Sequence, residues 1–354
     1  MTHGSRERFS RWWVWLALGL MFALVGGCSK PEPRQVLRVL AWSGYADPDV
    51  VARFEQQYNA KLDVAFINSD DELWSKLNDR SGDQFDVFAV NTAELKRYID
   101  AGISVPLELD KIPNTHHQLP RFEHLDAIPG ITRDGKVYGI PYTYSAIGLI
   151  YNRDLVKQPP TSMAAMWDPQ YQGKVLAYDG SNHNFTITAL ILGIEDPFHL
   201  NDAQFHQVVN ELIKLRRNVL TFYRSPEQAV DLYRKNKVAL VFGNYGTQQV
   251  KQLRDAGANI GYVIPREGAL AWLDCWSVTK HARNRLLAEK WINFMLEQDN
   301  SNVLTQREGL ANTVTPSPAT LESDKIIWIR PVEDFAKRAR LWAKIRSGDV
   351  PELF

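Results

Sequence analysis

Short apolar runs alternate with stretches of helical spacing along most of the chain. Residues 36–42, 62–67 and 85–90 are apolar runs of strand length. Each is followed by a helical pattern, and Asp47-Pro48 supplies an N-cap and a first-turn proline for the first helix. Strands that alternate with helices in this way predict a parallel sheet covered by helices.

The rest of the chain continues the alternation with longer helices. We expect two α/β lobes, with chain crossings near residues 142–145 and 271–277. Lobe 1 would comprise 36–143 plus about 277–325, lobe 2 would comprise 144–276 plus part of the C-terminal segment, and 326–354 would be a C-terminal helix region. Further strands are predicted at 137–142, 146–152, 174–179, 238–244, 260–265 and 268–279, and further helices at 70–78, 92–102, 202–217, from 225, 247–256, 284–298, 301–308 and 333–346.

The N-terminus has the features of an export signal. Arg6, Arg8 and Arg11 precede an apolar run at 12–25, which is short for a membrane span. Cys28 follows Gly-Gly, which resembles the lipobox of bacterial lipoproteins. We expect cleavage after residue 27, lipidation of Cys28 and a tether at 28–35; the alternative is an uncleaved anchor with an incidental cysteine. In both cases the protein lies outside the cytoplasm, in the periplasm if the lipoprotein interpretation holds.

Composition excludes several classes of function. Forty-one basic and 41 acidic residues cancel, which argues against nucleic-acid binding and against a polybasic membrane patch. The only cysteines are Cys28 and Cys275, so lipidation of the first leaves no intramolecular disulfide. The chain has no phosphate loop, dinucleotide fingerprint or nucleophile elbow. His116, His117 and His124 lack metal-ligand spacing. We therefore expect a monomeric binding protein without a catalytic site, metal or cofactor.

The stretch 268–279 contains the most suggestive chemistry. In an extended strand Trp272, Asp274 and Trp276 share one face. A carboxylate between indole rings suits an organic cation, through charge and cation–π attraction. The alternative is a buried strand whose tryptophans belong to the core. Other polar and aromatic residues follow strand ends, where the ligands of open α/β sheets bind.

Several segments, in order, resemble the periplasmic spermidine/putrescine-binding proteins. They include Leu-Ala-Trp-Ser-Gly-Tyr at 40–45, Tyr-Gly-Ile-Pro-Tyr at 138–142, Pro-Arg-Glu-Gly at 265–268, Trp-Leu-Asp at 272–274, Trp-Ile-Asn-Phe at 291–294 and the tail at 340–348. The resemblance implies the two-lobe periplasmic-binding-protein fold, type II-like, with the ligand cleft between the lobes. It also implies the solute-binding component of an ABC importer, with a small amine ligand and an ABC permease as partners.

The resemblance also implies a ligand site with departures from the family pattern. The aromatic pair Trp42 and Tyr45 and the amine anchor Trp272–Asp274 are present. Gly44, His183 and Thr247 stand where the family usually has acidic residues, and a tryptophan expected near Asn244 is missing. Either the ligand lacks a second amine, or Asp179 or the pair Asp70-Asp71 replaces the lost acid. The predicted ligand-binding residues are Trp42, Ser43, Tyr45, Thr92, Asp179, His183, Asn244, Trp272 and Asp274.

The sequence leaves the biological role open between two alternatives. The first is import of a polyamine or related amine, and the second is a periplasmic sensor that passes its ligand-bound form to a membrane signalling receptor. Both roles need the same cleft. A ligand other than a polyamine also remains open.

Overall fold

The computed structural model describes residues 1, 34–79, 83–316 and 326–348. Residues 2–33 lie outside the described residues. They contain the predicted export signal after Met1, Cys28 and most of the predicted tether. Within the described ranges, no helix has the length and apolar character needed to cross a bilayer. Residues 36–354 make up one compact unit, and the description below concerns that unit.

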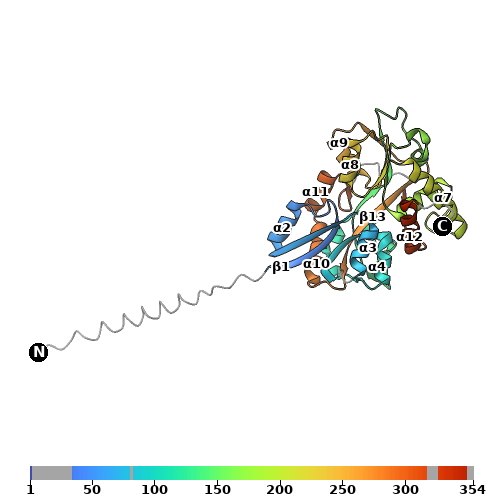
Figure 1. Ribbon diagram of the computed structural model, residues 1–354. Coiled ribbons are helices and arrows are strands. Elements are labelled where there is room, and N and C mark those ends of the chain that lie inside the picture. Colours follow the sequence, from blue (N-terminus) through green and yellow to red (C-terminus); the bar gives the residue numbers. More distant parts are fainter. Residues whose placement is uncertain (2–33, 80–82, 317–325, 349–354) are drawn as a thin grey trace. The chain divides into compact units, whose positions relative to one another are not determined.

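The first sheet is built around one long central strand, β13. In the described chain this sheet has eight strands in the order β14–β7–β13–β3–β1–β2, with β4 and β15 also paired to β13. The neighbours β1 and β3 run parallel, and β13 runs antiparallel to both β3 and β7. Every residue of β13 is buried, and Figure 1 shows the strand crossing the middle of the fold. The strands are β1 (Gln35–Trp42), β2 (Ala60–Ile67), β3 (Val87–Asn91), β4 (Ser104–Val105), β7 (Ile140–Ala146), β13 (Ala269–Thr279), β14 (Ala311–Asn312) and β15 (Ile326–Trp328).

The second sheet has five strands in the described chain, in the order β10–β9–β11–β8–β12. Strand β9 is parallel to β10 and β11, whereas β8 is antiparallel to β11 and β12. The strands are β8 (Gly148–Asn152), β9 (Val175–Tyr178), β10 (Thr221–Tyr223), β11 (Leu240–Gly243) and β12 (Ile260–Val263), and a separate two-stranded sheet joins β5 (Thr132–Arg133) to β6 (Lys136–Val137).

The chain passes between the two main sheets at different points from those we expected. It leaves the first sheet after β7, at Ile147, and returns between β12 and β13. The expected crossings at 142–145 and 271–277 instead lie inside β7 and β13, because both strands pair within the first sheet along these residues.

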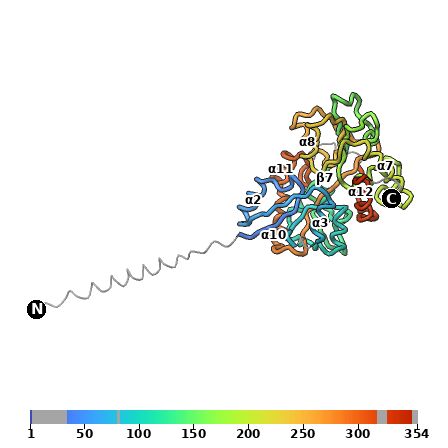
Figure 2. Tube along the Cα trace, in the orientation of Figure 1, coloured from blue at the N-terminus to red at the C-terminus, as the bar shows by residue number. Residues whose placement is uncertain are grey.

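Helices cover both sheets, and side-chain caps start many of them. Asp47, Ser69 and Asn91 accept hydrogen bonds from the first-turn amides of α2, α3 and α4. Helix α12 packs against α6 and α7, and Figure 2 shows it in red beside α7. The α-helices are α2 (Pro48–Tyr58), α3 (Asp70–Asn78), α4 (Thr92–Asp100), α5 (Pro120–Glu123), α6 (Ser181–Ile191), α7 (Asp202–Asn218), α8 (Pro226–Lys235), α9 (Thr247–Asp255), α10 (Arg285–Met295), α11 (Gln298–Glu308) and α12 (Phe335–Ser347). Short 3₁₀ turns occupy Leu109–Lys111, Pro113–His117, Leu125–Ala127, Met163–Trp167 and Pro169–Tyr171.

Helix α6 is the main element that the apolar pattern did not predict. Its sequence, Ser-Asn-His-Asn-Phe-Thr-Ile-Thr-Ala-Leu-Ile, is rich in β-branched residues of modest helix propensity. Eight of its eleven residues are buried, so no polar face marks a helical period. Burial against α7 and α12 stabilises the helix instead. His183 therefore lies in the first turn of a helix and not in a loop after a strand.

A buried ion pair joins β1 to the segment before β3. Asp86 is fully buried and accepts hydrogen bonds from Arg38 Nε at 2.9 Å and from the Arg283 amide at 2.8 Å. The Arg38 amide also donates to the same carboxylate, at 2.8 Å. Because a lone charge left in the core is costly, this pair fixes the position of β1.

We expect Asp86→Ala to lower the free energy of unfolding by about 3–5 kcal/mol, because it leaves the Arg38 guanidinium buried without its partner. Urea-induced unfolding followed by circular dichroism would measure the loss. The matched control is Asp63→Ala on β2, whose partner Lys61 at 2.8 Å is exposed, and it should have little effect. Equal effects of the two substitutions would contradict the expectation.

Candidate functional site

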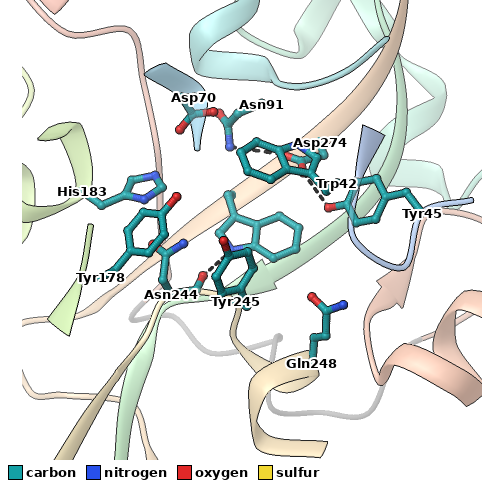
Figure 3. A pocket seen from close by; sticks show the side chains of 11 residues that line it. Trp42, Tyr45, Asp70, Asn91, Tyr178, His183, Asn244, Tyr245, Gln248 and Asp274 are labelled. Carbon is teal, nitrogen blue, oxygen red and sulfur yellow. Dashed lines mark hydrogen bonds between the residues drawn. The ribbon is translucent and has the colours of Figure 1, made fainter. Parts of the chain in front are cut away.

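A cavity lies where elements of the two main sheets meet. It contains about 390 Å³ of space not filled by atoms, a volume that includes space open to solvent. Figure 3 shows the side chains that surround it. Residues from strands of the first sheet and the segments next to them are Trp42, Tyr45, Asp70, Asn91, Trp272 and Asp274, and those from strands of the second sheet and the segments next to them are Tyr178, His183, Asn244, Tyr245 and Gln248.

Strand ends position most of this lining. Trp42 and Asn91 are the last residues of β1 and β3, and Tyr178 is the last residue of β9. Asn244 and Tyr245 directly follow β11. The carboxyl ends of parallel strands thus converge on the cavity, as expected for open α/β sheets.

Six of the nine residues predicted from the sequence line the cavity, and three do not. The six are Trp42, Tyr45, His183, Asn244, Trp272 and Asp274. Ser43 points away and donates a hydrogen bond to Glu227 at 3.0 Å. Thr92 lines a different cavity, together with Leu273. Thr247, at a usually acidic family position, is not part of the lining and its amide binds Ser145 Oγ at 3.1 Å.

Asp179, the third residue outside the cavity, already has cationic partners. Arg224 Nε lies 2.9 Å and Arg346 Nη1 lies 2.8 Å from its Oδ2. Trp342 Nε1 donates to its other oxygen at 3.0 Å. Its charge is thus balanced within the protein, and it is not available as the second acid of the cavity.

Asp274 is a buried carboxylate with neutral partners. The Tyr45 hydroxyl donates to its Oδ2 at 2.6 Å, and Asn91 Nδ2 donates to its Oδ1 at 3.4 Å. The side chain is almost inaccessible, with 6% of the residue exposed. Burial raises the pKa of Asp274 to about 7, although both hydrogen bonds favour the charged form. None of the eleven residues that line the described cavity is Lys or Arg, so the lining provides no counter-charge.

Aromatic rings form much of the wall. The Trp272 indole is held by a hydrogen bond from its Nε1 to the Asn244 carbonyl, at 3.0 Å. The rings of Tyr178 and Tyr245 meet edge to face, with centroids 5.7 Å apart. The Tyr178 hydroxyl donates to the Asn68 carbonyl at 3.1 Å, and the Tyr245 hydroxyl shares its hydrogen between that carbonyl, also at 3.1 Å, and the Arg224 carbonyl. The two bonds to Asn68 connect residues of the second sheet to the loop that precedes α3.

Trp276 does not join Trp272 and Asp274 in the cavity, although the alternation of the strand suggested it. It is fully buried and packs against Trp291 and Tyr142, with ring centroids 5.8 and 5.6 Å away. The pairing of β13 with β7 also shifts register between Asp274 and Cys275. The core interpretation therefore holds for Trp276, whereas Trp272 and Asp274 belong to the cavity lining.

His183 is electrically neutral in this environment. Burial lowers its pKa to about 4, and its ring lies 5.8 Å from that of Tyr178. At neutral pH it adds no positive charge that would repel a cationic ligand.

A carboxylate from elsewhere occupies the space beside Gly44. Gly44 has a φ of +86°, and a Cβ there would lie 2.6 Å from Cδ of Glu308, the last residue of α11. Gln248 Nε2 donates to Glu308 Oε2 at 2.8 Å and to the Ser43 carbonyl at 3.3 Å. Gln248 lines the cavity and Glu308 does not. Position 44 therefore has no acid of its own, but the Glu308 carboxylate lies next to it and binds Gln248, outside the cavity lining.

The nine predicted ligand-binding residues do not include Asn91, Tyr178, Tyr245 or Gln248, and Asp70 was expected only together with Asp71, as a possible replacement for the lost acid. A usable signal existed for Asp70 and Asn91, because each lies next to or at the end of a first-sheet strand, where a helix begins. Tyr178 and Tyr245 also border strand ends, but tyrosines there are common in cores. Gln248 has no distinguishing signal.

Comparison with known proteins identifies the family. Residues 49–328 match the bacterial extracellular solute-binding protein family. The chain belongs to this family. Its members bind solutes and are not enzymes, as the sequence predicted. The predicted resemblance to spermidine/putrescine-binding proteins and the periplasmic-binding-protein fold are confirmed.

Individual relatives and structures support this assignment. The putrescine-binding periplasmic protein PotF of Escherichia coli K12 is 26% identical over 373 residues, covering 96% of this chain and 98% of that protein. A putative spermidine/putrescine ABC transporter structure from Listeria monocytogenes has a TM-score of 0.79 and 22% identity, covering 88% of this chain and 99% of that one. MotA from A. tumefaciens B6, in complex with glucopine, has a TM-score of 0.71 and 16% identity, covering 88% and 100%. The last two share the fold.

The raised pKa of Asp274 predicts a pH-dependent cost of folding. Because folding raises this pKa from 3.8 to about 7, the stability that the group contributes is present below pH 4 and is lost as the pH rises through 7. The ionisable groups near it are Tyr45, Asp70 and Cys275, none of which is cationic. Asp274→Asn should therefore stabilise the ligand-free protein more at pH 8 than at pH 5, by up to about 3 kcal/mol.

Urea unfolding of the ligand-free protein at the two pH values would measure this difference. Cys275→Ala, the neighbouring substitution on β13, serves as the control, because the Cys275 thiol stays uncharged at both pH values. An equal effect of Asp274→Asn at pH 5 and pH 8 would show that Asp274 does not titrate in this range.

Proposed function

We propose that the protein is the extracytoplasmic solute receptor of an ABC importer and that it binds an amine in the cavity. The observation that carries the proposal is the Asp274 carboxylate, which is buried and whose hydrogen-bond partners among the described residues are Tyr45 and Asn91. A buried charge is costly unless it is paired. An ammonium group would supply both the missing charge and further hydrogen-bond donors.

The aromatic wall suits the same ligand. Trp42 and Trp272 line the cavity with Asp274, and indole faces attract cations by about 0.5–2 kcal/mol each. They also provide apolar contact for the methylene groups of an alkylamine. In this proposal Tyr45 orients the Asp274 carboxylate, since its hydroxyl donates to it at 2.6 Å.

The charge of the lining argues against solutes that carry a carboxylate. Asp70 and Asp274 both face the cavity, and the lining contains no Lys or Arg. An amino acid or an opine would bring a further negative charge without a cationic partner. The fold alone does not decide the ligand, since MotA with glucopine has it too. The names of PotF and of the Listeria protein favour a polyamine.

Binding would proceed by closure of two lobes, one around each main sheet. Hydrogen bonds already connect the two sides, including those from Tyr178 and Tyr245 to the Asn68 carbonyl. The features of residues 1–28 favour export to the periplasm and a lipid anchor on Cys28. The liganded monomer would then deliver its solute to an ABC permease in the membrane.

A thermal-shift screen of the purified protein tests the class of ligand. Putrescine, spermidine or butylamine should raise the melting temperature by mass action, whereas alanine and glutamate should not. A shift with the amino acids and none with the amines would overturn the proposal. Screening at pH 8 keeps Asp274 ionised.

Replacing the proposed counter-ion tests the site itself. Asp274→Ala should weaken binding of any amine by about 100-fold or more, because the ammonium group would be buried without a partner. Isothermal titration calorimetry measures the affinity. The control is Cys275→Ala on the same strand, whose thiol donates to the Val90 carbonyl at 3.3 Å and does not line the cavity. Unchanged affinity in Asp274→Ala would exclude the proposed anchor.

A further inference from the structure

A second carboxylate in the cavity, that of Asp70, has an oxygen without a hydrogen-bond partner among the described residues. Asp70 is the first residue of α3, where the Ser69 cap sets the start of the helix. Its side chain lines the same cavity as Asp274, and Figure 3 shows Asn91 between the two acids. The Asp70 Oδ1 atom is buried, and within the described ranges nothing donates a hydrogen bond to it. Buried polar atoms are rarely left in this state unless something else satisfies them.

The neighbouring acids differ from Asp70 in this respect. Asp71 accepts a hydrogen bond from Ser181 Oγ at 3.3 Å. Glu94 pairs with Arg97 at 2.7 Å and accepts a hydrogen bond from Asn182 at 2.6 Å. Both acids are therefore bound by residues of α4 or α6.

The cation whose charge acts on Asp70, Arg97, is bound to groups other than the Asp70 carboxylate. Arg97 donates to the main-chain carbonyl of Asp70 at 2.9 Å and forms its ion pair with Glu94. Its guanidinium is also stacked on the Trp74 ring, 4.7 Å from the centroid. Arg97 thus offsets the negative charge around Asp70 only in part, and Asp70 lines the cavity.

The charges around Asp70 also favour a bound cation. Burial raises the pKa of Asp70, and the charges of Glu94, Asp274 and Asp71 raise it further against the opposing effect of Arg97. His183, which lines a smaller pocket together with Asp70, is neutral. A cation bound in the cavity would therefore reduce the repulsion among these acids, since the lining contains no Lys or Arg that does so.

We propose that Asp70 is a second ammonium anchor, so that the ligand carries two cationic groups, one bound by Asp274 and one by Asp70. The inference rests on the amine-binding function proposed above and adds its specificity. In this proposal an acid from α3 takes the place of the one expected at position 183, and it lines a smaller pocket together with His183. Asp70 then discriminates diamines from monoamines, whereas Asp274 binds both.

The test compares putrescine with butylamine, which has the same four-carbon chain and a single amine. Affinities are measured by titration calorimetry at pH 8 for the unsubstituted protein and for Asp70→Asn, which keeps the shape of the side chain. We expect putrescine to bind the unsubstituted protein more tightly than butylamine does. Asp70→Asn should weaken putrescine by about 10- to 100-fold, the range for one hydrogen bond to a charged group, and change butylamine by less than about 3-fold.

Asp71→Asn is the matched control, since it removes the same charge one residue away, at a site already bound by Ser181. It should leave the ratio of the two affinities unchanged, and circular dichroism checks that both variants fold. If Asp70→Asn leaves putrescine binding unchanged, or weakens both amines equally, the inference fails while the amine-binding function stands. If the unsubstituted protein binds neither amine, the inference fails, and the wider thermal-shift screen decides on the amine function.

Discussion

The properties of the site follow from one carboxylate that the protein buries and leaves without a counter-charge. Asp274 accepts hydrogen bonds from Tyr45 and Asn91, but neither partner is charged. Removing an ion from water costs several kcal/mol unless an opposite charge accompanies it. A closed cavity without ligand is therefore disfavoured at neutral pH and above, and a bound cation removes the penalty. In this way the buried charge would make closure of the lobes depend on a bound cation.

Several residues that position the acids of the cavity also stabilise the fold. Asn91 caps α4 through its side-chain oxygen and donates to Asp274 through its nitrogen. Ser69 caps α3, and the helix start that it defines presents Asp70 to the cavity. The Tyr178 and Tyr245 hydroxyls bind the carbonyl just before that cap. Because the caps and the ligand contacts share residues, small movements of α3 and α4 would alter affinity as well as stability.

The sequence predicted the elements whose periodicity is clean and some of the site residues at strand ends. Trp42, Tyr45 and the Trp272–Asp274 pair were selected because they follow or form apolar strands and match the family pattern, whereas Asn91 and Tyr178, which also end strands, were not selected. Helix α6 was not found, since a helix buried on nearly all sides has no polar stripe and its β-branched residues suggest a strand. The choice between Asp179 and Asp70 as the second acid could not be made from position, because both stand next to a strand end. Only the ion pairs of Asp179 with Arg224 and Arg346 separate the two residues.

The contact between Gly44 and Glu308 has a consequence for how a ligand is assigned to the site. A side chain at position 44 would displace the Glu308 carboxylate and disturb its hydrogen bond from Gln248, on a backbone whose φ of +86° favours glycine. Restoring an acid at position 44 alone would therefore move a second carboxylate and a side chain that lines the cavity. The residue at position 44 thus has to be interpreted together with the residue at position 308 when a ligand is assigned.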